Sequence, residues 1–280
     1  MVEPIATLIT TISLNFLKKL GVQQSVVFSS VLVFSSLTSY SMDYDEQLPA
    51  DLINGAPDFE MEGVAEQLEK MMDGVRVKNI TSPIWRYPLP VHQLKHFHFS
   101  NLNFKPMRFI SMNKKQNWQV SCDQEENKWA EDDEFKVLEV PLCEESLSFV
   151  VFLPKRHDEL LEKSLERLTP LRFESLIHDL SPGYIQFKLP VFKIHSNIPT
   201  SRLLGFHRRP FHNRMKFKIA NQSAQNSQEE CRVIRRSARG MIKRPCESIP
   251  MIFNANRPFF FSIMHRGMPV TMGAFTGEEN

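Results

Sequence analysis

Apolar residues recur at helical spacing near the start of the chain and predict a helix over residues 4–20. Its apolar side chains fall on one face, so we expect an amphipathic helix docked on a core. That face consists of Ile5, Leu8, Ile9, Ile12, Phe16 and Leu20. A shorter apolar run follows over residues 26–34, which predicts a buried strand running into a helical turn.

The two segments after this run differ in character. Residues 43–58 are acidic and rich in turn-forming residues, which predicts a loop or linker. Residues 59–72 place most of their apolar side chains close to one face and predict a helix, for which Gly74 supplies a stop signal. Residues 80–118 mix Pro, His and Phe without a clean period, so the pattern predicts no element there.

Clearer patterns begin near the middle of the chain. Residues 134–142 and 146–154 predict two neighbouring strands joined by a short acidic turn. Residues 158–180 predict helical structure interrupted at Pro170, because proline lacks the N–H that a helix interior needs.

The last third of the chain reads mostly as strands. Residues 181–194 alternate between apolar and polar and predict a single strand. Residues 253–275 predict two strands with a turn at His265–Gly267. Helices and strands are mixed without βαβ alternation, so we predict an α+β fold with antiparallel sheets, in one domain over residues 1–280.

The composition is that of a soluble globular protein, with 42% hydrophobic and 24% charged residues. The 22 phenylalanines and 18 prolines favour sheet packing punctuated by turns. A net charge of only +2 gives no reason to expect nucleic acid as a partner. The apolar run at 26–34 is too short to span a membrane, so we expect no membrane partner.

Positive charge is concentrated between Arg202 and Arg244, where twelve lysines or arginines face only two acids, Glu229 and Glu230. This excess predicts attraction to a heparin-like polyanion or to an acidic partner. The alternative interpretation is a solvated basic surface. The candidate polyanion-binding residues are Arg202, Arg208, Arg209, Arg214, Lys216 and Lys218.

No constellation of residues that would support catalysis is visible. The serine-hydrolase, zinc-protease, phosphate-loop and dinucleotide motifs are all missing from the sequence. His92, His96 and His98 lie close together, but no acid or cysteine nearby completes a metal-binding set. Asp132–Glu134 form an acidic run on a turn, which we interpret as solvated. We therefore expect no enzyme, no metal and no cofactor.

The stretch CRVIRRSARGMIKRPCESIP, residues 231–250, is the most unusual part of the basic region. It holds six lysines or arginines and no acid before Glu247. A Cys231–Cys246 bridge would close most of it into a loop, and free thiols are the alternative.

The stretch FNANRPFFFSI, residues 253–263, carries a family resemblance. It is similar to the signature of the serpins, large α+β proteins most of which inhibit serine proteases by a suicide-substrate mechanism. Residues 127–154 and 185–194 resemble the family's central strands in the same order. The resemblance implies helices packed on mixed or antiparallel sheets, with an exposed reactive-centre loop over residues 231–250. Residues 43–58 stand where the family has several helices and a strand, which implies an incomplete main sheet.

The same resemblance assigns a bait residue. Counting back from FNANRPF places Arg244 before the scissile bond, whereas counting forward from Glu229 reaches Pro245. Arginine at that position suits a trypsin-like serine protease, whose specificity pocket holds an acid. Proline after the bond hinders most such enzymes. The alternative bait residues are Arg239, Lys243 and Arg236.

Trapping in this family requires the cleaved loop to insert into the main sheet as a new strand. By resemblance, the hinge of that movement comprises Glu229, Glu230, Cys231 and Arg232. The family has small residues after the acidic pair, whereas Arg232 and Arg236 lie here on the inward-facing set. Burying an unpaired arginine costs several kcal/mol, so we expect slow insertion. Ser29 is retained from the family's shutter motif, and Asn221 replaces its histidine.

The resemblance implies an extracellular monomer whose partner is a trypsin-like serine protease. The first residues contain Glu3 and polar residues within the apolar run, and they show no clear secretory signal, so the cytoplasm is the alternative location. Two function hypotheses follow. The first is a protease inhibitor that acts by bait and trapping, and the second is a non-inhibitory binding protein whose 202–244 region binds a polyanion or acidic partner.

Overall fold

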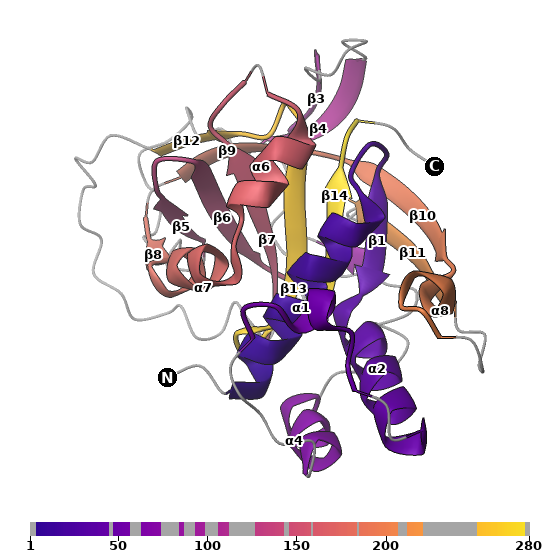
Figure 1. The fold of residues 1–280 in the computed structure, drawn as a ribbon. Coiled ribbons are helices and arrows are strands. Elements are labelled where there is room, and N and C mark those ends of the chain that lie inside the picture. The colour runs from indigo at the N-terminus through magenta and orange to yellow at the C-terminus, as the bar shows by residue number, and fades with distance from the viewer. Residues whose placement is uncertain are drawn as a thin grey trace.

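A computed structural model gives the fold of most of the chain (Figure 1). The described residues are 4–44, 47–56, 63–73, 84–86, 93–98, 106–111, 127–142, 146–157, 159–183, 185–206, 212–220 and 251–277. Within these ranges the strands form three sheets, and no helix is long and apolar enough to cross a membrane.

The largest sheet has seven strands, and every neighbouring pair in it is antiparallel. Its strands, in spatial order, are β1 (Val26–Ser29), β14 (Met268–Phe275), β13 (Phe259–His265), β7 (Leu147–Pro154), β6 (Phe135–Pro141), β5 (Lys128–Glu131) and β8 (Ser181–Pro182). The turn predicted between the last two strands is confirmed, because Arg266 (φ 50°) and Gly267 (φ 82°) reverse the chain with left-handed backbone.

The remaining strands form two smaller sheets. One has the order β10 (Phe192–Ile198), β11 (Asn213–Ala220), β2 (Ile84–Arg86), and the other has the order β12 (Met251–Asn254), β9 (Ile185–Pro190), β4 (Pro106–Ser111), β3 (Gln93–His98). The pairs β11–β2 and β12–β9 are parallel. The α+β fold with mixed or antiparallel sheets is therefore confirmed, and the two parallel pairs join strands that are distant in sequence and that no hairpin signal links.

Seven helices are described, and α1 is the most enclosed of them. They are α1 (Pro4–Leu20), α2 (Ser30–Tyr44), α3 (Ala50–Ile53), α4 (Val64–Met71), α6 (Leu161–Arg167), α7 (Pro170–His178) and α8 (Thr200–Leu203). α1 packs on β14 and is covered by α2, α3 and α7. The predicted bounds of α1 are confirmed, but even its polar residues Thr10, Thr11 and Ser13 are buried, so it is not amphipathic in its setting.

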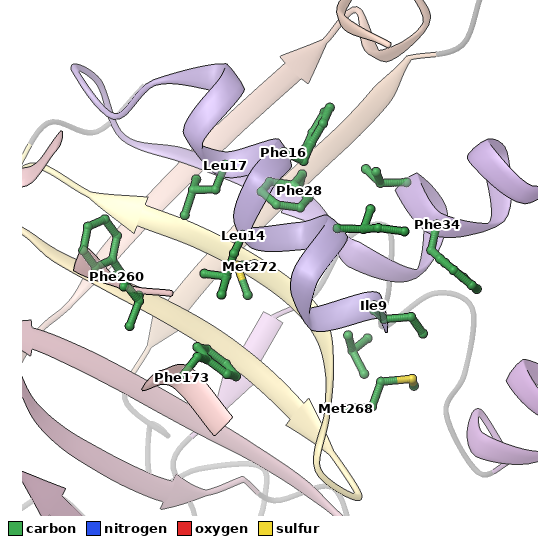
Figure 2. Close-up of a cluster of buried hydrophobic side chains, with 14 of the residues drawn as sticks. Ile9, Leu14, Phe16, Leu17, Phe28, Phe34, Phe173, Phe260, Met268 and Met272 are labelled. Atoms are coloured by element: carbon green, nitrogen blue, oxygen red, sulfur yellow. The ribbon is translucent and has the colours of Figure 1, made fainter. Parts of the chain in front are cut away.

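The seven-stranded sheet is buried on both faces by two apolar clusters. Along β13, Phe260 and Met264 face the cluster under α1, whereas Phe259, Phe261 and Ile263 face the smaller sheets. Figure 2 shows the first cluster, in which Phe16 and Phe28 meet edge to face with ring centroids 4.9 Å apart. Alternate side chains of a strand point to opposite faces, so each strand supplies both clusters.

Phenylalanine builds most of the second cluster. Phe192 of β10 stacks on Phe275 of β14 with ring centroids 4.3 Å apart, and Phe217 of β11 lies 4.8 Å from Phe261 of β13. All four side chains are at most 1% exposed. The three-stranded sheet is therefore fastened to the seven-stranded sheet by aromatic contacts.

Two further predictions need correction, and a third is confirmed. Residues 43–58 were expected to form a loop, but α2 extends to Tyr44 and α3 forms at residues 50–53, because Leu52 is buried against the core. The single strand expected at 181–194 is divided among β8, β9 and β10, which belong to three sheets. The interruption at Pro170 is confirmed. Helix α6 ends before this proline, which is the first residue of α7.

Candidate functional site

The bait segment and its hinge lie outside the described residues. This applies to the candidate scissile bond at Arg244 and Pro245, to the alternative bait residues Arg239, Lys243 and Arg236, and to the hinge residues Glu229, Glu230, Cys231 and Arg232. The structure does describe the residues on either side. The segment leaves the end of β11 at Ala220 and returns at the start of β12, at Met251.

The strand before this segment ends beside a parallel neighbour. β11 pairs with β2 through three residue pairs: Lys218 with Ile84, Ile219 with Trp85 and Ala220 with Arg86. A chain that leaves the end of β11 and turns back runs antiparallel to both strands, so its backbone groups can pair with either of them. The three-residue pairing is short, which makes this edge of β11 the easiest to open among the β10–β11–β2 contacts.

The return of the chain into the core is fixed by the FNANRPF stretch. The backbone N–H of Ala255 donates to the Lys188 carbonyl (2.9 Å), which extends the β12–β9 pairing. The Arg257 guanidinium is 8% exposed and donates to the Pro154 carbonyl from Nε (2.9 Å) and Nη2 (2.6 Å). Burial lowers the pKa of Arg257 to about 10. The chain from Met251 onward is therefore tightly anchored in the core.

The beginning of β11 is anchored by a buried polar cluster around Ser29. Asn213 is fully buried, and its Oδ1 accepts from the Ser29 backbone N–H (3.3 Å) while its Nδ2 donates to the Ser29 carbonyl (3.2 Å). The Asn213 backbone N–H donates to Thr200 Oγ1 (3.2 Å). Ser29 Oγ accepts from the Leu32 N–H (3.2 Å) and caps the start of α2.

Sequence periodicity alone does not single out Asn213 as a functional residue. The sequence does carry a signal, because Asn213 shares its parity with the buried residues Met215 and Phe217 of the same strand. A polar residue on the apolar face of a strand implies a buried hydrogen-bonding partner. Ser29, which the family resemblance had picked out, is that partner.

The opposite face of β11 carries the predicted basic residues. Arg214, Lys216 and Lys218 alternate with the buried residues and are exposed, and Arg202 is exposed on α8. Arg208 and Arg209 lie outside the described residues. The structure thus brings three of the six candidate residues together in one row.

The neighbouring strand β10 places a second row of exposed side chains beside this one. Lys193 pairs in register with Lys218, His195 with Lys216 and Asn197 with Arg214, and all six residues are exposed. The pKa of His195 is lowered by desolvation first and then by the charges of Lys193 and Lys216. Among the described residues, no carboxylate forms an ion pair with any cation of this set, which we call the basic face.

A polar hollow of about 500 Å³ adjoins the basic face. It lies where the turn between α1 and β1 meets β10, and the Val27 N–H donates to Ser196 Oγ (3.0 Å) across this junction. In Figure 1, β1 lies beside β10 and β11. The hollow is lined by Leu20, Gly21, Gln23, Gln24, Ser25, Val26, His195, Ser196, Asn197 and Ile198.

The acidic turn is only partly solvated, because Asp133 is exposed whereas Glu134 is buried. Glu134 is only 7% exposed and pairs with Arg156 (2.8 Å) and Arg167 (2.7 Å), so the interpretation of this residue as solvated is wrong. Asp132 Oδ1 accepts from the backbone N–H groups of Glu134 (2.8 Å) and Phe135 (2.7 Å), which shapes the turn before β6.

The histidine set is not assembled into a metal site in the described structure. His92 lies outside the described residues, and His96 and His98 belong to β3. Within the described ranges, no group of three or more His, Cys, Asp or Glu side chains is placed to hold a metal ion.

Comparison with known proteins gives one consistent result. The family model described as Serpin (serine protease inhibitor) matches residues 82–277, more than half of the chain. Among solved structures, SRPN18 from Anopheles gambiae is similar with a TM-score of 0.64 and 12% identity, over 99% of this chain and 99% of that one. A search of curated proteins gave no match.

Two other solved serpins agree with this match. The Manduca sexta serine protease inhibitor (serpin)-12 has a TM-score of 0.61 at 12% identity, over 96% of this chain and 98% of that one. Tengpin, a thermophilic serpin in its native state, has a TM-score of 0.61 at 12% identity, over 99% of this chain and 95% of that one. At these identities the likeness concerns the fold.

Proposed function

This chain belongs to the serpin family, and from that membership we propose that it offers residues 231–250 as bait to a trypsin-like serine protease. Arg244 is the residue before the scissile bond. The observation that carries the proposal is the placement of the strand before the bait segment, since β11 ends beside a parallel neighbour with which it shares only three residue pairs. Trapping follows if the cut segment enters there as a new antiparallel strand before the acyl-enzyme is hydrolysed.

The two ends of the bait segment are held differently, and this difference supports the proposed insertion. The Met251 end is held by the β12–β9 pairing and by the buried Arg257. The Ala220 end continues directly from β11, so it can extend the sheet without disturbing that anchor. After a cut at Arg244, the segment attached to β11 moves and the segment attached to β12 stays.

The composition of the hinge limits the trapping. Arg232 and Arg236 lie on the parity that would face the interior, and burying an unpaired guanidinium costs several kcal/mol. We therefore expect most encounters to end in simple cleavage and a minority in a stable complex.

Incubation with trypsin tests the proposal. A denaturing gel is expected to show a cleaved chain together with a minor band at the summed mass of chain and protease, and mass spectrometry should place the cut after Arg244. Replacing Arg232→Ala should increase the share of complex, whereas Arg244→Ala should abolish the cut there. Cleavage in 232–244 with no complex, even for Arg232→Ala, would contradict trapping.

A second function is favoured by a separate observation: no carboxylate of the described residues forms an ion pair with a cation of the basic face. We propose that the chain binds a polyanion or acidic partner there, with Arg214, Lys216 and Lys218 as the central residues. Retention on immobilised heparin that falls steeply as salt rises is expected, because binding to a polyanion releases counterions. Retention that does not depend on salt would contradict it.

We propose the extracellular space as the location and a monomer as the state, both from the family resemblance. Detection of the chain in culture medium after expression in eukaryotic cells tests the first. Elution from a sizing column at the mass of one chain, 32.6 kDa, tests the second.

A further inference from the structure

A serine hydroxyl and a buried imidazole meet at one end of the seven-stranded sheet. Ser146 Oγ lies 2.9 Å from Nδ1 of His265. Ser146 is an exposed residue, whereas His265 is fully buried. The pair therefore joins the hydroxyl of a surface residue to a base that solvent does not reach, and it belongs neither to the bait segment nor to the basic face.

Strand pairing fixes the relative position of the two residues. His265 is the last residue of β13 and lies opposite Leu147, the first residue of β7. Ser146 directly precedes Leu147, and the Leu142 N–H donates to the Leu147 carbonyl (3.0 Å), which closes the turn between β6 and β7. Side chains carried by paired strands keep their geometry better than side chains on free loops. The contact is therefore held by the backbone of the sheet.

The backbone of Ser146 adopts a conformation that does not favour serine. Its φ of 66° is left-handed, which glycine adopts freely and most other residues adopt only at a cost. Residues in such conformations are concentrated at functional sites. The turn alone would therefore be satisfied by glycine, whereas the contact with His265 requires the hydroxyl.

The imidazole of His265 is neutral near pH 7 and has a lone pair for the hydroxyl proton. Its pKa is lowered, by desolvation first and by the charge of Arg266, while backbone groups of Ser146, Met71 and Asp73 act in the opposite direction. Within the described residues, Ser146 Oγ is the one hydrogen-bond partner of the ring. Met71 and Asp73 lie at the C-terminal end of α4, where helix carbonyls are free to attract a ring proton. With Nδ1 directed at Ser146, these carbonyls favour the ring proton on Nε2, so that Nδ1 accepts from the hydroxyl.

A serine hydroxyl that donates to a neutral, oriented imidazole is the arrangement of an activated nucleophile. We propose that Ser146 is an acyl-acceptor site that reacts with small activated esters, with His265 as its general base. Ser146 Oγ attacks the carbonyl carbon of the ester while its proton passes to His265 Nδ1. The carbon–oxygen bond to the leaving alcohol then breaks, and the alcohol takes that proton from the imidazole. One ester of the donor is replaced by one ester of Ser146, so the step needs no oxidant and no cofactor.

Acetylation by p-nitrophenyl acetate tests the proposal. Mass spectrometry of peptides from the treated chain gives the rate at each serine, and Ser181, an exposed residue of β8, is the internal reference. Ser146 should react about a hundredfold faster than Ser181, because a positioned general base contributes a factor of about 10²–10⁴. His265→Gln should remove this difference, whereas the control His212→Gln, which changes an exposed histidine, should preserve it.

The same reaction in urea separates the effect of the folded pair from the reactivity of the serine itself. In the unfolded chain, Ser146 and Ser181 should be acetylated at equal rates, and this comparison decides the matter even if thermal melts show that His265→Gln does not fold. Equal rates in the folded chain would overturn the proposal and leave Ser146 as a hydrogen-bond partner that satisfies a buried ring. A preference for Ser146 that persists in urea, or in a folded His265→Gln variant, would overturn it as well. The trypsin and heparin assays judge the proposed functions independently of this result.

Discussion

The seven-stranded sheet and the three-stranded sheet differ in the polarity of their faces and in the length of their strand pairings. In the seven-stranded sheet both faces are apolar, and β6, β7 and β13 pair over six or more residues. In the three-stranded sheet one face is apolar and the other basic, and β2 is joined by only three pairs. The comparison indicates that the first sheet supplies stability, whereas the second combines one short pairing with one exposed basic face.

The largest expected effect lies in the seven-stranded sheet. Phe152 of β7 is 1% exposed and stacks on Phe173 of α7 with centroids 4.6 Å apart. Replacing Phe152→Ala should lower the free energy of unfolding by about 3–5 kcal/mol through lost burial and a cavity. Urea denaturation measures it, with the exposed Leu171→Ala of α7 as the control. A loss below about 1 kcal/mol would contradict the role of this sheet as the stable one.

A smaller effect is expected where the two sheets meet at Ser29. Replacing Asn213→Ala leaves the Ser29 N–H and carbonyl without their side-chain partner inside the protein, which should cost about 2 kcal/mol. Hydrogen exchange should show faster opening of β11 than of β13. The exposed Asn197→Ala serves as control and should leave exchange in β11 unchanged. Equal acceleration in both strands would show that the three-stranded sheet does not open separately.

The pH dependence of the unfolding free energy tests the burial of His265 at the end of β13, in the seven-stranded sheet. His265 is fully buried with Nδ1 2.9 Å from Ser146 Oγ, and its pKa is lowered, by desolvation first and by the charge of Arg266, while nearby backbone groups act in the opposite direction. The fold therefore favours neutral His265. Neutral His265 contributes its full stabilisation of the fold above about pH 6.5. This stabilisation is lost as the pH falls below that value through the pKa of the ring in the folded protein.

Unfolding free energies at pH 7.5 and 5.0 measure this effect. The chain should lose more stability on acidification than the variant His265→Gln, which cannot gain a proton. His212, which is exposed just before β11, provides the control variant His212→Gln, which should keep the loss of stability on acidification. A steeper loss for His265→Gln would contradict the account.

The smallest effect is expected on the basic face. Replacing Lys193→Ala removes one partner of a like-charge pair, so stability should rise by less than about 0.5 kcal/mol at low salt. The gain should vanish at high salt, because exposed charges are then screened. Thermal melts at 20 mM and 500 mM salt measure it. A loss of stability at low salt would mean that Lys193 has a favourable partner.

The sequence predicts many of the local elements of this molecule but little of their assembly, and it misses the strands β2, β3 and β4 within residues 80–118. The helix at 4–20 and the strands β6, β7, β13 and β14 follow from periodicity, because each is continuous in sequence and dominated by burial. The strand expected at 181–194 is instead shared by three sheets. An alternating pattern shows which side of its strand each residue occupies, but it does not show which other strand pairs with that strand.

The same limit applies to the candidate site. Arg214, Lys216 and Lys218 were named as candidate binding residues from the local excess of positive charge, but the strand that places them in one row was not predicted. Lys193 and His195 were missed, since they reach the row only through the pairing of β10 with β11. Asn213 was missed for a related reason, because its partner Ser29 is distant in sequence.

The central claim is that the sheet of β10, β11 and β2 accepts the cut bait segment as a new strand. The most direct measurement compares the melting temperature of the intact chain with that of the chain cut by trypsin after Arg244. Insertion adds a strand with hydrogen bonds on both sides, so the cut chain should melt at least several degrees higher than the intact chain. A cut chain that melts at the same temperature or lower would contradict insertion and leave the protein a substrate rather than a trap.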